Sequence, residues 1–113
     1  MYKITSITNK PKQTFRVSLD TGDQVEMALY FLPTQYSWYY DFTYKSYTSN
    51  GNKVVLSPNS IRNLRHILPF GIAFIASGVV EPYSLDDFYT DRVSMYVLNA
   101  DEVQQIEEAV FND

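Results

Sequence analysis

The sequence predicts a mainly β protein, a small antiparallel β-barrel or sandwich built of hairpins, with one C-terminal α-helix. Three observations lead to this fold class. Runs in which apolar and polar residues alternate, the period of a strand with one buried face, recur along most of the chain. Turn-forming residues rich in Gly, Asp and Asn separate these runs. Apolar residues adopt clear helical spacing near the end of the chain, at Val103, Ile106 and Val110.

The size and composition indicate one folded domain. The chain has 113 residues, of which 45% are hydrophobic and 16% aromatic, which is enough for a single core. We expect an N-terminal arm or edge strand over residues 1–12, a β-rich domain over 13–98 and a helix over 99–113 that packs on the same domain. The absence of cysteine excludes disulfides and thiolate metal sites, and it fits a reducing compartment.

Charge is divided unevenly along the chain. Residues 1–80 carry a formal charge of +4 and residues 81–113 one of −8, which together give the net −4. Two interpretations remain open at this point. An acidic end of one copy contacts the basic flank of another, or the acids form a solvated helix face.

The first predicted hairpin follows the arm. Alternating residues over 15–19 and 25–31 flank the turn sequence Asp20-Thr21-Gly22-Asp23. Pro33 ends the second strand, because proline has no N–H to donate to a ladder.

An aromatic strand comes next. Seven of the twelve residues from 36 to 47 are aromatic. With a period of two, Trp38, Tyr40, Phe42 and Tyr44 share the face that we assign to the core, since burial of such rings contributes about 1.5–3 kcal/mol each. The opposite face, with Tyr39, Asp41 and Thr43, has the mixed character of an interface. We expect Asn50-Gly51 to form a type I′ turn, with the return strand over residues 53–56.

The second half of the chain contains two further strands. Residues 57–60 begin a short helical turn that Pro69 ends. Residues 70–80 are apolar or small and predict a strand that is buried on both faces or interrupted near Gly78. Two turns over 81–84 and 85–88 precede a strand over 92–98, in which Val93, Met95 and Val97 share one face.

The closing helix has a recognisable start. With Asn99 as its N-cap, Glu102 occupies the third helical position, which is the capping-box relation. We expect Glu102, Gln105 and Glu108 to face outward.

Catalytic and metal-binding patterns are absent from the sequence. His66 is the one histidine, and no nucleophile motif lies near it. The Asp86-Asp87 pair with Asp91 lacks the glycine and the final glutamate of an EF-hand, so we assign these residues to turns and caps. The four glycines are too widely spaced for a phosphate-binding loop. We therefore predict no enzyme, no cofactor and no metal site.

Membrane and nucleic-acid binding are not favoured. The longest apolar stretch is too short to span a bilayer, and interfacial helices prefer basic residues, so we expect a soluble, cytosolic protein. The alternative function is a single-stranded nucleic-acid or small-ligand binding module that stacks its ligand on the aromatic strand over residues 36–47. The net charge and the shortage of cations beside this strand oppose nucleic acid.

The order of several short motifs resembles a known family. The motifs are Leu19-Asp20-Thr21-Gly22, Trp38-Tyr39-Tyr40-Asp41, Gly51-Asn52, Leu68-Pro69-Phe70-Gly71, Asp86-Asp87-Phe88 and the strand over residues 93–97. Together, over residues 13–98, they resemble the baseplate plug family of contractile-tailed bacteriophages. The chain departs from that pattern at Phe88-Tyr89, where members often have glycine after the acidic pair, and in the helix over residues 100–110.

The resemblance implies a small β-rich structural protein at the centre of a simple baseplate, without catalytic activity or a cofactor. It implies a place in the virion tail after assembly in the host cytoplasm. The implied partners are tail tube, hub, spike and wedge proteins, together with copies of the chain itself. Ten tyrosines are more than a core of this size holds, and tyrosine suits contact surfaces. The predicted interface residues are Tyr30, Tyr36, Tyr39, Tyr47, Tyr83 and Tyr89.

Overall fold

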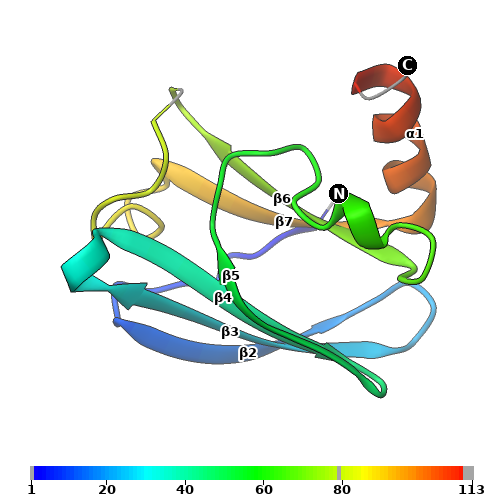
Figure 1. Cartoon of the computed structure of the whole chain (residues 1–113), viewed down its shortest axis with the longest axis horizontal. Coiled ribbons are helices and arrows are strands. Elements are labelled where there is room, and N and C mark those ends of the chain that lie inside the picture. The colour runs from blue at the N-terminus through cyan, green and yellow to red at the C-terminus, as the bar shows by residue number, and fades with distance from the viewer. Residues whose placement is uncertain (1, 79, 111–113) are drawn as a thin grey trace.

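The computed structural model describes residues 2–78 and 80–110. Two antiparallel sheets face each other, and a helix lies against the outer side of one of them (Figure 1). Neither sheet closes on itself, so of the two predicted architectures the sandwich fits.

The four-stranded sheet is built from one continuous part of the chain. Its strands are β2 (Lys12–Ser18), β3 (Gln24–Leu32), β4 (Ser37–Tyr44) and β5 (Tyr47–Lys53), in the order β2-β3-β4-β5. The β2–β3 hairpin confirms the first predicted hairpin, and its turn lies where the sequence places it. As predicted, Pro33 ends β3, and a single 3₁₀ turn, η1 (Pro33–Gln35), follows.

The second predicted hairpin has the wrong turn. The chain reverses at Lys45-Ser46, where Lys45 has a φ of 53°, and the return strand is β5 rather than residues 53–56. Asn50-Gly51 lies inside β5, at a bulge. The register passes from Tyr40 opposite Asn52 to Phe42 opposite Ser49, so Asn50 and Gly51 both fall opposite Asp41. The positive φ of Gly51, 72°, therefore serves a bulge instead of a turn.

The three-stranded sheet joins distant parts of the chain. Its strands are β1 (Tyr2–Lys3), β6 (Phe70–Ala76) and β7 (Val93–Asn99), in the order β1-β7-β6. Within residues 1–12, β1 lies at the edge of this sheet, where Tyr2 pairs with Val97. The expected strand over residues 70–80 is shorter, since β6 ends at Ala76; Val79 falls outside the described residues. Residues 70–74 of β6 are buried, as predicted for this segment.

Aromatic rings fill the space between the sheets. Trp38, Tyr40 and Phe42 on β4 are each at most 3% exposed, which confirms the predicted core face. They meet rings from the opposite sheet. The ring centroids of Phe42 and Phe70 are 5.8 Å apart, and those of Tyr40 and Phe74 are 5.3 Å apart. The inward residues of β7, Val93, Met95 and Val97, complete this core.

The helix α1 (Ala100–Val110) covers the other side of the three-stranded sheet. The predicted capping box is present: the Asn99 N–H donates to Glu102 Oε1 at 3.0 Å, and the Glu102 N–H donates to Asn99 Oδ1 at 2.8 Å. Val103 is buried with Ala73 and Leu98, whereas Val110 at the end of the helix is 57% exposed. None of the helices in residues 2–78 and 80–110 has the length and apolar character needed to cross a membrane.

An ion pair fixes α1 to the predicted helical turn, which forms the 3₁₀ helix η2 (Arg62–Leu64). Arg62 contacts Glu107 with an Nη2–Oε1 distance of 2.6 Å, and Arg65 Nε lies 3.5 Å from the same oxygen. These contacts lower the pKa of the Glu107 carboxyl, chiefly through its hydrogen bonds with Arg62. Thus some of the basic residues of the segment 1–80 pair with an acidic residue of the segment 81–113 within one molecule.

Candidate contact surfaces

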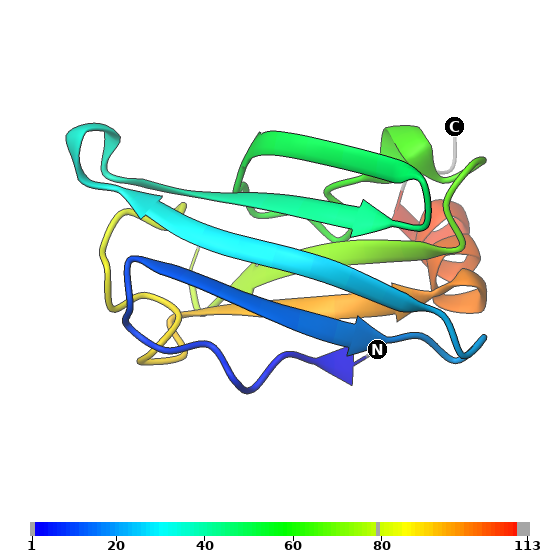
Figure 2. The ribbon, with the colours of Figure 1, turned by 90° about the horizontal axis from the view of Figure 1, so that it is seen from below.

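The outer face of the four-stranded sheet is one candidate contact surface. Figure 2 views it from below the sandwich, and no other described element lies across it. We call this surface the outer face. The strand register places its side chains in rows across the sheet: Lys12, Tyr30, Tyr39 and Lys53; then Thr14, Ala28 and Asp41; then Arg16, Glu26, Thr43 and Thr48.

Two tyrosines are held in fixed positions on the outer face. The rings of Tyr30 and Tyr39 stack with centroids 6.0 Å apart and an interplanar angle of 19°. The Tyr30 hydroxyl donates to Asp41 Oδ1 at 3.1 Å, and the Tyr39 hydroxyl donates to Gln35 Oε1. Partial burial of the Tyr30 hydroxyl and its hydrogen bond to the Asp41 carboxylate raise the pKa of Tyr30. Both rings are therefore ordered before any partner binds.

The bulge in β5 supports this arrangement. The Gly51 N–H donates to the same Oδ1 atom of Asp41 at 2.7 Å. This carboxylate oxygen therefore links the bulge to Tyr30 on a strand two positions away in the sheet. The bulge is the element that the sequence prediction missed, and its signal, Asn50-Gly51, was present but was assigned to a turn.

A hollow of about 570 Å³ lies beside the stacked tyrosines. Ala28 lines it, and its side chain is shorter than those of its neighbours on the sheet. The exposed ion pair between Arg16 Nη2 and Glu26 Oε1, 3.0 Å apart, lies along one side. Thr14, Asp41 and Thr43 line the rest of the polar rim. The outer face thus combines aromatic area, charges of both signs and a concave centre.

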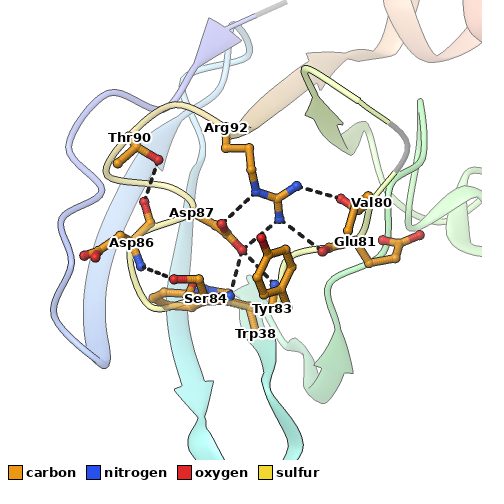
Figure 3. Close-up of polar contacts among 9 residues, drawn as sticks. All are labelled: Trp38, Val80, Glu81, Tyr83, Ser84, Asp86, Asp87, Thr90 and Arg92. Carbon is orange, nitrogen blue, oxygen red and sulfur yellow. Dashed lines mark hydrogen bonds and ion pairs between the residues drawn. The ribbon is translucent and has the colours of Figure 1, made fainter.

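The second candidate surface is the end loop, which we define as residues 80–92 (Figure 3). Arg92, directly before β7, organises it. Its Nε donates to Asp87 Oδ1 at 2.7 Å and its Nη2 donates to Oδ2 at 2.8 Å. The same guanidinium donates to the carbonyl oxygens of Val80 at 3.0 Å and Glu81 at 3.1 Å. One side chain therefore joins both ends of the loop.

Asp87 is the centre of this network. Its Oδ2 also accepts the N–H groups of Tyr83 at 2.7 Å and Ser84 at 2.8 Å, as Figure 3 shows. Burial alone would raise the pKa of the Asp87 carboxyl, but Arg92 and the two backbone donors outweigh it and lower the pKa. Asp87 shapes the turn, as predicted, but it is not a helix N-cap, because the N–H groups that it accepts belong to residues before it in the chain.

Aromatic packing holds the end loop against the sandwich. Trp38 Nε1 donates to the Ser84 carbonyl oxygen at 2.9 Å. The Phe88 ring meets Trp38 edge to face, with centroids 5.2 Å apart. Phe88 is 4% exposed, so it is part of the core.

The structure divides the six predicted interface tyrosines among the outer face, the end of η1 with Tyr36, the end loop and the core. Tyr30 and Tyr39 lie on the outer face. Tyr36, Tyr83 and Tyr89 are 70%, 54% and 62% exposed, and the last two belong to the end loop. Tyr83 lies under the Arg92 guanidinium, 4.8 Å from ring centroid to Cζ.

Tyr47 has a different environment. It is half-buried and packs on Phe42 with centroids 6.1 Å apart, so it contributes to the core. Tyr2 on β1, which was not among the predicted residues, is 63% exposed. Its place on an edge strand is the feature that would have placed it among the predicted interface residues.

The rings of the aromatic strand are not available as one stacking platform. Trp38, Tyr40 and Phe42 are buried, which leaves Tyr39 as the ring of β4 on the outer face. His66 is exposed, and no cluster of three or more potential metal ligands occurs among residues 2–78 and 80–110.

Comparison with known proteins identifies the family. No curated protein matches the sequence. A family model described as the cyanophage baseplate Pam3 plug gp18 matches residues 1–101. The match includes every described strand of both sheets, and it leaves most of α1 outside. This agrees with the predicted resemblance, including the helix as the part that departs from it. The chain therefore belongs to the cyanophage baseplate plug family and is a structural protein of a phage tail baseplate.

Proposed function

We propose that the chain is a hub or plug subunit of a contractile tail that works through protein–protein contacts alone, without catalysis. Its neighbours are tail tube, hub, spike and wedge proteins and further copies of the chain, and assembly takes place in the host cytoplasm. The subunit fills or braces the axial hub until sheath contraction rearranges the proteins around it.

The outer face carries this proposal. Its stacked Tyr30 and Tyr39 are flanked by Lys12 and Lys53 in one row, on a sheet face that no other described element covers. Association costs less free energy when the contacting side chains are already ordered, since fewer rotamers are lost. Tyrosine adds a large contact area and a hydroxyl that pairs with polar groups.

The end loop supports the same function. Tyr83 and Tyr89 lie on a loop that the Asp87–Arg92 pair and Trp38 hold in place, so this surface is also rigid. A subunit that must keep a defined position among several neighbours benefits from two fixed surfaces at different places on the sandwich.

The test is a phage that encodes Tyr30→Ala together with Tyr39→Ala. The variant protein is expected to fold, because both side chains lie outside the core, and the yield of complete tails is expected to fall by about tenfold or more, as for loss of a contact worth roughly 1.4 kcal/mol. Gln104→Ala with Gln105→Ala, on the exposed side of α1 and outside the matched region, is the control and keeps the wild-type yield.

The readouts are electron microscopy of tails, infectious titre and detection of the protein in purified virions. Normal infectious tails that contain the double tyrosine variant would contradict the role of the outer face. Purified virions that lack the wild-type protein would contradict the plug function itself.

A further inference from the structure

The edge of β2 differs from the other three sheet edges. β1 has two residues. The edge of β6 is occupied, because Ser57 and Phe74 exchange N–H to oxygen hydrogen bonds of 3.0 Å in both directions. β5 is interrupted by its bulge. Only β2, among the described strands, presents a long edge of seven residues in unbroken register with its single neighbour.

The hydrogen-bond pattern shows which backbone groups of β2 are free. Leu19 N–H donates to the Asp23 oxygen at 2.8 Å, and Phe31 N–H donates to the Pro11 oxygen at 2.7 Å. Hydrogen-bonded and non-hydrogen-bonded pairs alternate in an antiparallel ladder, so the odd-numbered residues of β2 bond to β3. The N–H and C=O groups of Thr14 and Arg16 therefore point away from β3, and no described residue forms a hydrogen bond with them.

The side chains along this edge include two basic residues on the outer side, and Phe15 and Val17 with the polar Gln13 on the inner side. Lys12 and Arg16 are exposed on the outer face, and β2 has no acidic residue. Arg16 contacts Glu26, but this pair is solvent-exposed and therefore weak. On the inner side, a hollow of about 330 Å³ lies beside the end of β2, where Val17, Leu19 and Val97 supply apolar lining and Asp20 and Glu102 supply acidic lining.

We propose that the β2 edge binds an extended segment of another protein as a fifth strand, and that this segment alternates acidic with apolar residues. Its backbone pairs with the free groups of Thr14 and Arg16, as in strand addition to an open sheet edge. Its acidic side chains lie beside Lys12 and Arg16, and its apolar side chains turn toward the hollow. That the segment belongs to a baseplate neighbour rests on the proposed function; the binding chemistry of the edge does not.

A second copy of β2 is a poorer occupant. Pairing two β2 strands brings Lys12 and Arg16 of both copies to one seam with no acid from either strand, and like charges across a strand pair are destabilising. Lysine and arginine on an edge strand commonly prevent such self-association. The charges thus disfavour pairing of β2 with a second copy of itself and favour a partner strand with acidic side chains.

The test titrates the full-length protein with a capped peptide that alternates glutamate and valine, followed by amide chemical shifts and hydrogen exchange. In the free protein the amides of Thr14 and Arg16 exchange quickly while those of Phe15 and Val17 are protected. The acidic peptide is expected to bind and to protect Thr14 and Arg16. A peptide with lysine in place of glutamate is the matched probe and does not bind.

Two variants at one position separate strand pairing from other contacts. Thr14→Pro removes the outward N–H but keeps the β2–β3 bonds, since proline is tolerated at an edge. It is expected to weaken binding at least about tenfold, the effect of losing roughly 1.4 kcal/mol. Thr14→Ala keeps the N–H and binds like the wild type. The double variant Lys12→Glu with Arg16→Glu reverses the charge beside the edge. It is therefore expected to bind the lysine peptide in place of the acidic one.

Three outcomes would overturn the proposal. The acidic peptide does not bind, or Thr14→Pro leaves its binding unchanged, or Thr14 and Arg16 are protected by dimerisation when no peptide is present. Incorporation into virions is measured separately. A protein that binds the peptide but is missing from tails refutes the plug function alone, and one that is incorporated but binds no peptide refutes the strand site alone.

Discussion

Asp87 and Arg92 form an ion pair with two parallel hydrogen bonds of 2.7 and 2.8 Å, although five positions of a turning loop separate them. The Asp87 side chain is 6% exposed and that of Arg92 is 24% exposed. The pair therefore lies largely out of water, where loss of one partner leaves the other without compensation.

Asp87→Asn is expected to lower the free energy of unfolding by about 3 kcal/mol, the low end of the cost of breaking a buried pair. Asn keeps the shape but loses the charge and one acceptor. Asp86→Asn, at the exposed neighbouring position, is the control and is expected to change the stability by less than about 0.5 kcal/mol. Urea unfolding measures both variants. Equal stability of the two variants would show that the ion pair does not hold the end loop.

The Asp87 carboxyl also predicts that the stability of the fold decreases at low pH. Because the folded state lowers the pKa of Asp87, its contribution is complete above the pKa of the unfolded chain, about 3.9, and is lost as the pH falls through the lower folded value. The stability difference between wild type and Asp87→Asn is therefore expected to narrow between about pH 5 and pH 2. Urea titrations at several pH values measure it, and a difference that stays constant over this range would contradict the assignment.

The buried Tyr40 hydroxyl predicts that the stability of the fold decreases at high pH. Burial raises the pKa of its hydroxyl to about 12, so the fold favours the neutral phenol. This contribution is complete below the unfolded pKa of about 10 and is lost as the pH rises from there through about 12. Tyr40→Phe is expected to retain relatively more stability above pH 10, by up to about 3 kcal/mol near pH 12. Tyr36→Phe, which removes a hydroxyl from a 70% exposed ring, is the control.

Gly51→Ala is expected to cost about 1 kcal/mol, because the φ of 72° is unfavourable for any residue with a Cβ even though space around it is open. Gly78→Ala also meets open space, and no positive φ applies there, so it is expected to be neutral. Thermal unfolding compares the two. A neutral Gly51→Ala would mean that the bulge relaxes to another backbone conformation.

Much of the fold was predictable because its signals are local. The β2–β3 hairpin, the buried face of β4 and the Asn99–Glu102 capping box each depend on residues a few positions apart. Alternation or fixed spacing therefore reveals them directly. The choice of a sandwich over a barrel depends on how two sheets meet, and no local pattern reports it.

The turn between β4 and β5 was not predictable in the same way. Asn50-Gly51 signals a positive φ, and both a type I′ turn and a bulge require one. Pairing of Tyr44 with Tyr47 decides between them, since it closes the hairpin at Lys45-Ser46 before Gly51 is reached.

The candidate contact surfaces were only partly predictable. The alternation in β4 indicates that Tyr39 points away from the core, and the structure places it there. Stacking on Tyr30 depends on the β3–β4 register, and the packing of Tyr47 on Phe42 depends on the β4–β5 register. The contact between Trp38 and Ser84 joins residues 46 positions apart. Such contacts form only in the complete fold.

The pairing of β1 with β7 constrains the order of events during synthesis. Residues 2–3 are made before the other described strands, but their partners in β7, Tyr96 and Val97, belong to the last of these strands to be made. The four strands within residues 12–53 pair only with one another, so the four-stranded sheet can form while the three-stranded sheet is still incomplete. Until translation passes β7, the apolar side of the early sheet has no cover, and the nascent chain is then most vulnerable to aggregation.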